Sequence, residues 1–327
     1  MKRIFVFILA FVLLCGSALA SAGYNSFFDN RHNAGYYDFK AWDGEYVYWL
    51  DNQDERAWTD LPNNLYRMRP GEGQAEMILE GREDLHILNF WNIGDALLLA
   101  VHDSIYSEEA KPVLIDFDGG NYREIDGRIG SVVLAGDVLY NSVGGHIYEI
   151  DLDTMKSKKI YSYPEEIAAK DPILYQLADD MLYFSTDAIP NFYEIYSLYR
   201  YPDADTQIRK VYEGRGSWFV YRGWLYASDY ENNSGTWCYN ILGGGSFAKL
   251  SDKVYSFYQG YGQYLRALPM VKEGWVEDTE GVIIDMTKVQ GSLDDAIVRN
   301  CDHYYDAMLG GQLIRYDGQN NRMVAAE

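Results

Sequence analysis

Short hydrophobic runs, dense in Tyr and Leu, follow one another along most of this chain, and turns rich in Gly, Asp or Asn separate them. Gly, Asp and Asn tolerate the positive φ angles that tight hairpin connections need, so each of these turns predicts a β-hairpin. Helical periodicity is confined to single turns at 165–170 and 293–296. The pattern therefore predicts an all-β chain.

One phrase, a turn followed by a strand dense in Tyr and Leu, recurs seven times. Its copies lie at 43–48, 94–99, 136–140, 179–183, 223–226, 262–265 and 301–305. Successive turns are 39 to 50 residues apart. A period of this length with four strands per unit is the signature of a β-propeller. We predict a seven-bladed β-propeller of four-stranded antiparallel blades, with six or eight blades as the alternatives.

The innermost strand of each blade can be placed from the same phrase. These strands are expected at 36–42, 86–93, 131–135, 173–178, 217–222, 254–259 and 296–300, and the last blade is expected to run from 296 to 325. A blade cannot bury both of its faces alone, so the blades must stack in a ring until the first meets the last. We expect most of the 30 tyrosines to pack between neighbouring blades.

The N-terminus has the pattern of a secretory signal peptide. Lys2 and Arg3 precede an apolar run from 4 to 14, and small residues follow that run. Cleavage is expected after Ala20 or Ala22.

A lipid anchor on Cys15 is the weaker alternative, because Leu14 stands where that chemistry prefers a small residue. We expect an exported protein, which is extracellular, periplasmic or held at the cell surface. Its parts are a signal peptide at 1–20, a lead-in segment at 21–35 and one propeller domain at 36–327. Residues 24–34 of the lead-in are free to cover a sheet edge or to pair with the last blade.

The chain is strongly acidic. Its net charge of −21 at pH 7 becomes −23 when Lys2 and Arg3 leave with the signal peptide. Such a chain repels phosphate backbones and anionic lipid surfaces, which excludes nucleic-acid binding as the main activity. No later run is long enough to insert into a membrane. We expect a monomer with two buried free thiols, Cys238 and Cys301, which lie two repeats apart.

A known family shares part of this pattern. The phrase Tyr48-Trp49-Leu50-Asp51 resembles the Tyr-Trp-Thr-Asp phrase of low-density-lipoprotein-receptor propellers, and the third-strand phrases at 65–68, 147–151 and 313–318 extend the likeness. Together they look like exported bacterial propellers of unknown function that are compared with the lipoprotein-receptor-related propeller. The resemblance implies the fold over nearly the whole mature chain and a role in recognition. It carries over no functional residue.

Signals for metal or cofactor chemistry are weak. The segment 116–121 comes nearest to a calcium loop, yet Gly127 stands where a bidentate Glu is needed, and the segment joins two strands. The five histidines show no close pair that would suggest zinc. We expect neither a metal nor a cofactor.

Propeller glycosidases need two or three carboxylates close together around the channel. The expected innermost strands contain one acidic residue, Asp38, while Asp171 and Asp295 stand at strand starts. We therefore expect a protein without enzymatic activity. A carbohydrate-active enzyme, a glycoside hydrolase or a lyase, is the alternative, and a sensor or envelope-assembly scaffold is a third hypothesis.

The connections between second and third strands are long in five repeats, at 52–63, 102–111, 186–193, 229–235 and 268–280. In a propeller these connections emerge on one face, and insertions gathered on one face mark the binding side. Aromatic rings beside polar groups suit a protein partner or a sugar ring. The candidate ligand contacts in these loops are Arg56, Trp58, Tyr106, Phe192, Tyr230 and Trp275.

The alternative for each of these rings is that it folds back onto its own blade. We predict a recognition module that binds an unidentified protein or glycan on the face with the long loops.

Overall fold

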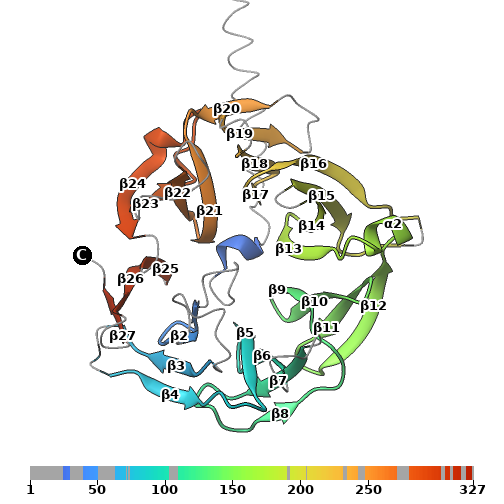
Figure 1. The fold of residues 1–327 in the computed structure, drawn as a ribbon, viewed down its shortest axis with the longest axis vertical. Helices are drawn as coiled ribbons and strands as arrows, with labels where there is room; N and C mark the ends of the chain where they lie inside the picture. The colour runs from blue at the N-terminus through green and yellow to red at the C-terminus, as the bar shows by residue number, and fades with distance from the viewer. Residues whose placement is uncertain are drawn as a thin grey trace, which may run out of the picture.

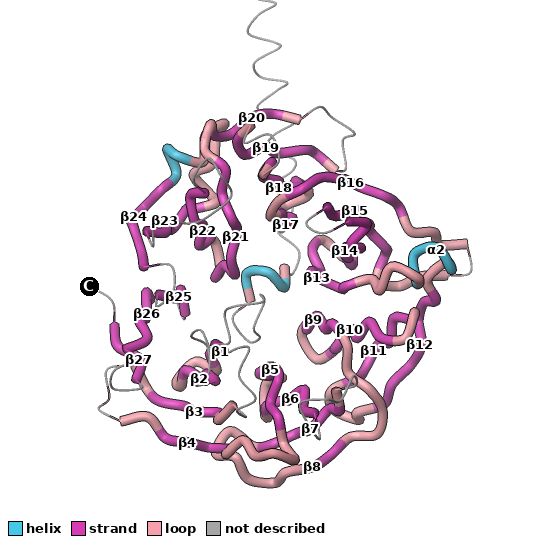
Figure 2. The backbone as a smooth tube through the Cα atoms, viewed as in Figure 1, coloured by secondary structure: helices cyan, strands magenta, loops and turns pink. Residues whose placement is uncertain are grey.

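Antiparallel β-sheets make up most of the described chain, and Figure 1 shows them arranged as a ring. The computed structural model describes residues 25–29, 40–50, 63–70, 72, 74–102, 110–189, 192–203, 205–230, 234–241, 247–270, 280–302, 306–309, 312–317 and 322–325. These residues form six four-stranded sheets, here blades 1 to 6, and a three-stranded C-terminal sheet. In each blade the strands follow sequence order from the centre of the ring to its rim (Figures 1 and 2).

The first three blades are built from contiguous sequence. Blade 1 contains β1 (Lys40–Trp42), β2 (Val47–Leu50), β3 (Leu65–Met68) and β4 (Glu76–Leu79). Blade 2 contains β5 (His86–Asn92), β6 (Leu97–His102), β7 (Lys111–Ile115) and β8 (Arg123–Glu124). Blade 3 contains β9 (Ser131–Ala135), β10 (Val138–Val143), β11 (His146–Asp151) and β12 (Lys156–Ser162).

The remaining sheets continue the same order. Blade 4 contains β13 (Ile173–Ala178), β14 (Met181–Ile189), β15 (Phe192–Tyr199) and β16 (Arg209–Arg215). Blade 5 contains β17 (Trp218–Tyr221), β18 (Trp224–Asp229), β19 (Gly235–Asn240) and β20 (Ala248–Ser251). Blade 6 contains β21 (Val254–Tyr261), β22 (Tyr264–Met270), β23 (Glu280–Asp285) and β24 (Ile297–Asp302). The C-terminal sheet contains β25 (Asp306–Leu309), β26 (Gln312–Asp317) and β27 (Arg322–Ala325).

Three short helices complete the described elements. They are η1 (Ser26–Phe28), α2 (Glu165–Ala168) and η2 (Asp294–Ala296), and the last two lie where the sequence predicted single turns. In the described part of the chain, no helix has the length and apolar character needed to cross a membrane.

The prediction of an all-β propeller with four-stranded antiparallel blades is confirmed, and the described residues form six such blades, which was the alternative to the expected seven. The segment 296–300, expected as the innermost strand of a last blade, belongs instead to β24 at the rim of blade 6. There Gly281 lies opposite Cys301 and Glu280 opposite Asp302, so the first two residues of the phrase at 301–305 belong to a rim strand and not to a first-to-second strand turn. The long connections between β22 and β23, and between β23 and β24, move the fourth strand of blade 6 to this later position.

Packing between neighbouring blades holds the ring together. Tyr48, Tyr140 and Tyr183 occupy equivalent second strands, and none is more than 2% exposed. Tyr48 packs with residues of blade 2, Tyr140 with residues of blade 4, and Tyr183 with residues of blade 5. Burying one large side chain of this kind stabilises a fold by on the order of 2 kcal/mol. The repeated tyrosines therefore join blades, as the sequence suggested.

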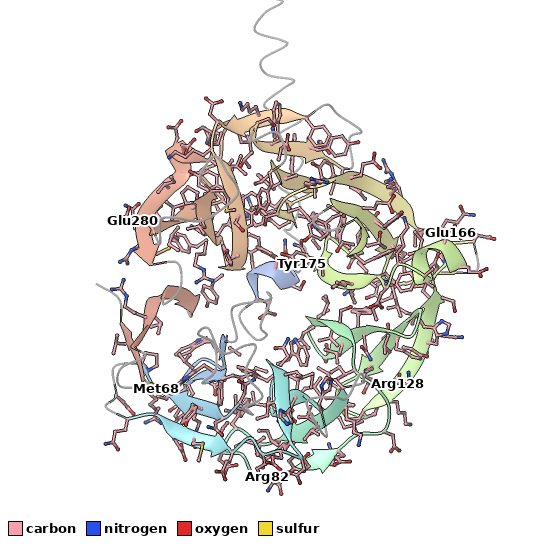
Figure 3. All side chains as sticks on the ribbon, in the orientation of Figure 1. Met68, Arg82, Arg128, Glu166, Tyr175 and Glu280 are labelled. Carbon is pink, nitrogen blue, oxygen red and sulfur yellow. The ribbon has the colours of Figure 1, made fainter. Side chains whose placement is uncertain are left out.

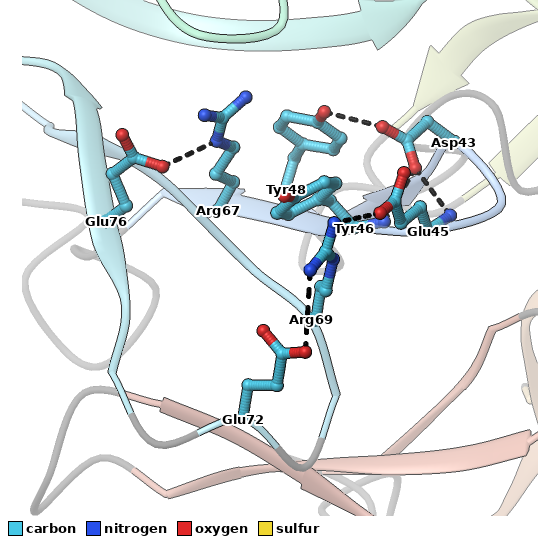
Figure 4. A network of polar contacts seen from close by, with 8 residues as sticks. All are labelled: Asp43, Glu45, Tyr46, Tyr48, Arg67, Arg69, Glu72 and Glu76. Carbon is cyan, nitrogen blue, oxygen red and sulfur yellow. Dashed lines mark hydrogen bonds and ion pairs between the residues drawn. The ribbon is translucent and has the colours of Figure 1, made fainter.

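A polar network accompanies this packing at the turn of blade 1 (Figure 4). The carboxylate of Asp43 accepts a hydrogen bond from the hydroxyl of Tyr48 at 2.6 Å and others from the backbone N–H groups of Glu45 and Tyr46. Burial and this carboxylate raise the pKa of Tyr48. Asp43 thus fixes both the turn and the tyrosine that follows it.

Arg67 extends the network to the next blade. Its Nε forms an ion pair with Glu76 at 2.8 Å, and its Nη1 donates to the carbonyl oxygen of Phe117 at 2.5 Å. The guanidinium groups of Arg67 and Arg69 both lie over the ring of Tyr46, at 4.9 and 5.0 Å from its centroid. Blade 1 is therefore tied to the third-to-fourth strand turn of blade 2 by a side chain as well as by apolar contact.

Glu194 of β15 links strands of blade 4 through ion pairs and hydrogen bonds. Lys170, in the connection before β13, and Lys210 of β16 both form ion pairs with its carboxylate, the second at 2.8 Å. The hydroxyl groups of Tyr196 and Thr186 donate to it at 3.1 and 3.3 Å. Hydrogen bonds from Lys170 and Lys210 lower the pKa of Glu194 to about 2.

We expect Glu194→Gln to reduce the acid sensitivity of the fold. The pKa of Glu194 is lower in the folded chain, so its stabilisation is complete above the ordinary value of 4.5 and disappears as the pH falls towards about 2. Across this pH range the free energy of unfolding of the wild type should fall by on the order of 2 kcal/mol more than that of the variant, as measured by denaturant unfolding. The exposed Glu166→Gln is the control (Figure 3), and equal losses in wild type and Glu194→Gln would contradict the assignment.

Candidate functional site

The centre of the ring is occupied by residues that precede the propeller in the sequence. Helix η1 lies there beside the innermost strands β13, β17 and β21 (Figure 1, and cyan at the centre of Figure 2). We call Asn25, Ser26, Phe27 and Phe28 the N-terminal plug. The expectation that the lead-in covers a sheet edge holds for these residues, because Asn25 forms an antiparallel bridge with Ala178 of the edge strand β13. That edge belongs to blade 4 and not to the last blade. The other lead-in residues, and the signal peptide, lie outside the described part of the chain.

Hydrogen bonds from three blades hold the plug. Asn25 pairs with Ala178 of β13 as an antiparallel bridge, and its Nδ2 donates to the carbonyl oxygen of Val220 at 2.9 Å. The backbone N–H of Leu177 donates to the hydroxyl of Ser26 at 2.9 Å. The backbone N–H of Gly262 donates to the carbonyl oxygen of Phe28 at 3.1 Å. Blades 4, 5 and 6 therefore each contribute a backbone partner.

Gln176 is the side chain that coordinates these contacts. Its Nε2 donates to Asn25 Oδ1 and to the carbonyl oxygen of Val220, both at 2.6 Å, and its Oε1 accepts from the N–H of Val220 at 2.8 Å. The side chain is fully buried. A β-bulge between Leu174 and Gln176 changes the register of β13 at this point. Gln176 thereby joins blade 4 to blade 5 and binds the plug.

The two phenylalanines of the plug insert into an aromatic cluster. Phe27 is 1% exposed and stacks on Phe219 with ring centroids 5.2 Å apart, while Phe28 lies 4.8 Å from the ring of Tyr221. Gly260 makes room for Phe28, because a Cβ at this position would lie 2.4 Å from the phenylalanine ring. The two phenylalanines of the plug are therefore part of the hydrophobic core of the propeller.

The plug lies towards one end of the central channel. Ala178 ends β13, and Gly262 is in the turn between β21 and β22, so both mark the face that carries the first-to-second strand turns. The connections between second and third strands emerge on the other face. The plug therefore lies towards the end of the channel that is opposite to the long loops.

Four half-buried tyrosines lie on the other side of the plug, between blades 4 and 6. This tyrosine cluster consists of Tyr175 and Tyr258 on innermost strands, and Tyr193 and Tyr230 beside second-to-third strand connections. Tyr175 lies near the centre of the ring (Figure 3), with its ring centroid 6.0 Å from that of Phe27 and 4.7 Å from that of Trp218. The cluster therefore connects the plug with the face that carries the long loops.

The phenols of this cluster influence one another. Burial raises the pKa of Tyr175, and the nearby phenols of Tyr230, Tyr193 and Tyr258 raise it further. Burial also raises the pKa of Tyr230 to about 12, although hydrogen bonds to Ser256 and Ser217 oppose the shift. The raised pKa values keep the phenols of Tyr175 and Tyr230 neutral at physiological pH.

A depression of about 330 Å³ lies on the same face at blade 3. There the connection between β10 and β11 is only the turn Gly144-Gly145. The exposed residues Arg128 and Asp171 and the hydroxyl-bearing Ser131 line this depression. It supplies polar and charged groups on the long-loop face.

Carboxylates for a glycosidase do not converge in the described chain. The described residues of β1, β5, β9, β13, β17 and β21 include no Asp or Glu. Asp171 precedes β13, whereas Asp295 lies in η2 before the rim strand β24, so the two belong to different parts of the ring. Among the residues that the structure describes, no group of His, Cys, Asp or Glu could hold a metal ion. Cys238 and Cys301 are buried free thiols, as predicted.

The structure describes few of the six predicted ligand contacts. Arg56, Trp58, Tyr106 and Trp275 lie outside the described residues, and Phe192 begins β15 without a described side chain. Tyr230 is half-buried and belongs to the tyrosine cluster, so its ring folds back towards the blades. All six stay predictions as ligand contacts.

Sequence analysis did not identify Gln176, Tyr175 or the plug. One signal was available, namely the apolar pair Phe27-Phe28 in the otherwise polar lead-in. Nothing comparable distinguishes Gln176, which lies in a strand that resembles its neighbours. Its role depends on contacts with residues 44 and 151 positions away in the sequence.

Comparisons with known proteins agree with the architecture. No protein-family model and no curated protein matches the chain. One chain of a mitotic checkpoint complex is similar in structure, with a TM-score of 0.53 and 12% identity over 94% of this chain and 96% of that chain. A prolyl endopeptidase is similar with a TM-score of 0.52 and 12% identity, and the match covers 100% of this chain and 55% of that chain. A chain of a nidogen/laminin complex has a TM-score of 0.40 and 10% identity, and the match covers 80% of this chain and 93% of that chain.

The first two of these likenesses show the β-propeller fold alone. At identities of 10 to 12%, they transfer no activity, site or partner to this chain.

We expect Gln176→Ala to destabilise the ring at the junction of blades 4 and 5. The variant leaves Asn25 and both backbone groups of Val220 without this partner, at a cost of about 2–4 kcal/mol. Thermal and denaturant unfolding should show the loss, while Gln290→Ala, at an exposed site, should leave stability unchanged. Wild-type stability in Gln176→Ala would contradict the role assigned to this side chain.

We expect the tyrosine cluster to make the fold sensitive to alkali. The pKa of Tyr230 is higher in the folded chain, so its stabilisation is complete below the ordinary value of 10.0 and is lost as the pH rises towards about 12. Tyr230→Phe should lose less stability than the wild type over this range, as followed by unfolding and by phenolate absorbance. Tyr201→Phe, at a site 53% exposed, is the control and should behave as the wild type does.

Proposed function

We propose that this chain is an exported, non-enzymatic recognition module that binds a protein or a glycan on the face with the long loops. The observation that carries the proposal is the position of the plug. The plug lies towards the opposite face, so it does not stand between the tyrosine cluster and the long-loop side. The depression at Gly144 lies on that same side.

The chemistry of this surface supports binding in preference to hydrolysis. Half-buried tyrosines offer aromatic faces together with hydroxyl groups, a combination that is frequent at protein and carbohydrate interfaces. The acidic net charge of −21 favours neutral or basic ligands over anionic ones. Membership of the exported bacterial propellers of unknown function, a signal peptide and a monomeric state belong to the same proposal.

We also propose that the C-terminal sheet acts as a seventh, shorter blade. It lies in the ring between blades 6 and 1, and β25 contacts both β21 and β1 (Figure 1). In this position it would bury the face of blade 6 and the face of blade 1 that are directed towards each other across the C-terminal sheet.

The proposal predicts that aromatic residues on one face alone are needed for binding. Mature protein, screened on a glycan array and used to capture proteins from the extracellular fraction of its host, should retain a specific ligand. Trp58→Ala or Trp275→Ala should then weaken that ligand's affinity at least about tenfold, which corresponds to about 1.4 kcal/mol.

The matched control is Trp224→Ala. Trp224 is 36% exposed and follows the turn at Gly223, on the face opposite to the long loops. Its replacement should leave the affinity unchanged. Recovery of no glycan or protein above background, or an equal loss in Trp224→Ala, would overturn the proposed function.

A further inference from the structure

The N-terminal plug is attached to its site only by non-covalent contacts. The blades that bind it are far away in the sequence, since Gln176 is 151 positions and Val220 195 positions from Asn25. The chain continues from the plug to β1, which belongs to blade 1, whereas the plug contacts the innermost strands of blades 3, 4, 5 and 6. A separate peptide with the same sequence could therefore make the same contacts.

The site has features of a receptor for a specific peptide. Gln176 donates a hydrogen bond to the side-chain amide of Asn25, and the N–H of Leu177 donates one to the hydroxyl of Ser26. Ala178 and Gly262 bind the backbone of the plug. The apolar part of the site accepts two adjacent aromatic rings. Phe219 stacks on the first, and Gly260 leaves space for the second.

The receptor strands also depart from regular pairing where they meet the plug. Register shifts occur between Leu174 and Gln176 in β13, and between Tyr258 and Gly260 in β21. Such bulges redirect side chains at the cost of regular ladder bonds. Here they place Gln176 against Asn25 and Gly260 against Phe28. The irregularities on both strands thus coincide with the two ends of the bound segment.

We propose that the centre of the ring is a peptide-binding site, specific for the sequence Asn-Ser-Phe-Phe, which the chain's own N-terminal segment occupies in cis. The predicted signal-peptide cleavage sites, after Ala20 or Ala22, lie only a few residues before Asn25. Export would therefore generate the free end of this ligand. The site is separate from the long-loop face, so only the free end of the ligand rests on the export that belongs to the proposed function.

The test uses the full mature chain. A recognition sequence for a site-specific protease is inserted between residues 30 and 39 and is cut after folding, which turns the plug into a separate peptide. We expect the fragment to remain bound in equimolar amount through size-exclusion chromatography. A synthetic peptide of residues 23–30 in excess should then displace it, as measured by mass spectrometry of the retained fragment.

The specificity of the site is tested with altered peptides, which need no variant of the protein itself to fold. A scrambled peptide of the same composition should not displace the fragment. Peptides carrying Asn25→Ala or Phe27→Ala should compete at least about tenfold more weakly, because each lacks a contact made in the buried site. Immediate loss of the wild-type fragment after cleavage, or equal competition by the scrambled peptide, would overturn the proposal.

Discussion

Each blade of this protein has two faces that must be buried, and the ring is the arrangement that buries both. Apolar residues from second and third strands meet those of the next blade, with the repeated tyrosines Tyr48, Tyr140 and Tyr183 fully enclosed between them. The hydrogen bond from Arg67 to the carbonyl oxygen of Phe117 makes this contact specific, since it fixes which edges of blades 1 and 2 lie side by side. A single blade could satisfy neither requirement, so the fold depends on its neighbours throughout.

Closing a ring of sheets creates a second constraint at the centre, where the innermost strands have no further sheet to cover them. The N-terminal plug meets this constraint on the side of blades 4 to 6. Its two phenylalanines cover apolar residues of β17 and β21, and Gln176 satisfies polar groups that would otherwise face the channel. A segment that lies at one end of the sequence is thus part of the core.

The plug also makes the two faces of the ring different. The plug lies towards the face with the first-to-second strand turns. The tyrosine cluster and the depression at Gly144 lie on the other side, and the described residues of the innermost strands of blades 1 to 6 include no carboxylate. The proposed recognition role rests on the aromatic rings and hydroxyl groups of this side.

The sequence by itself determined the strands, their period and the propeller, because turn residues and hydrophobic runs act locally and repeat. It failed at 301–305, where a phrase with the right composition lies at the end of a rim strand, since pairing with β23 outweighs local turn propensity. The sequence pointed to Tyr230 by its place in a loop, yet the environment of its phenol is set by Tyr175 and Tyr258, which lie on other strands. The plug and Gln176 were decided by the tertiary structure alone, because their hydrogen bonds join residues up to 195 positions apart, which no local pattern encodes.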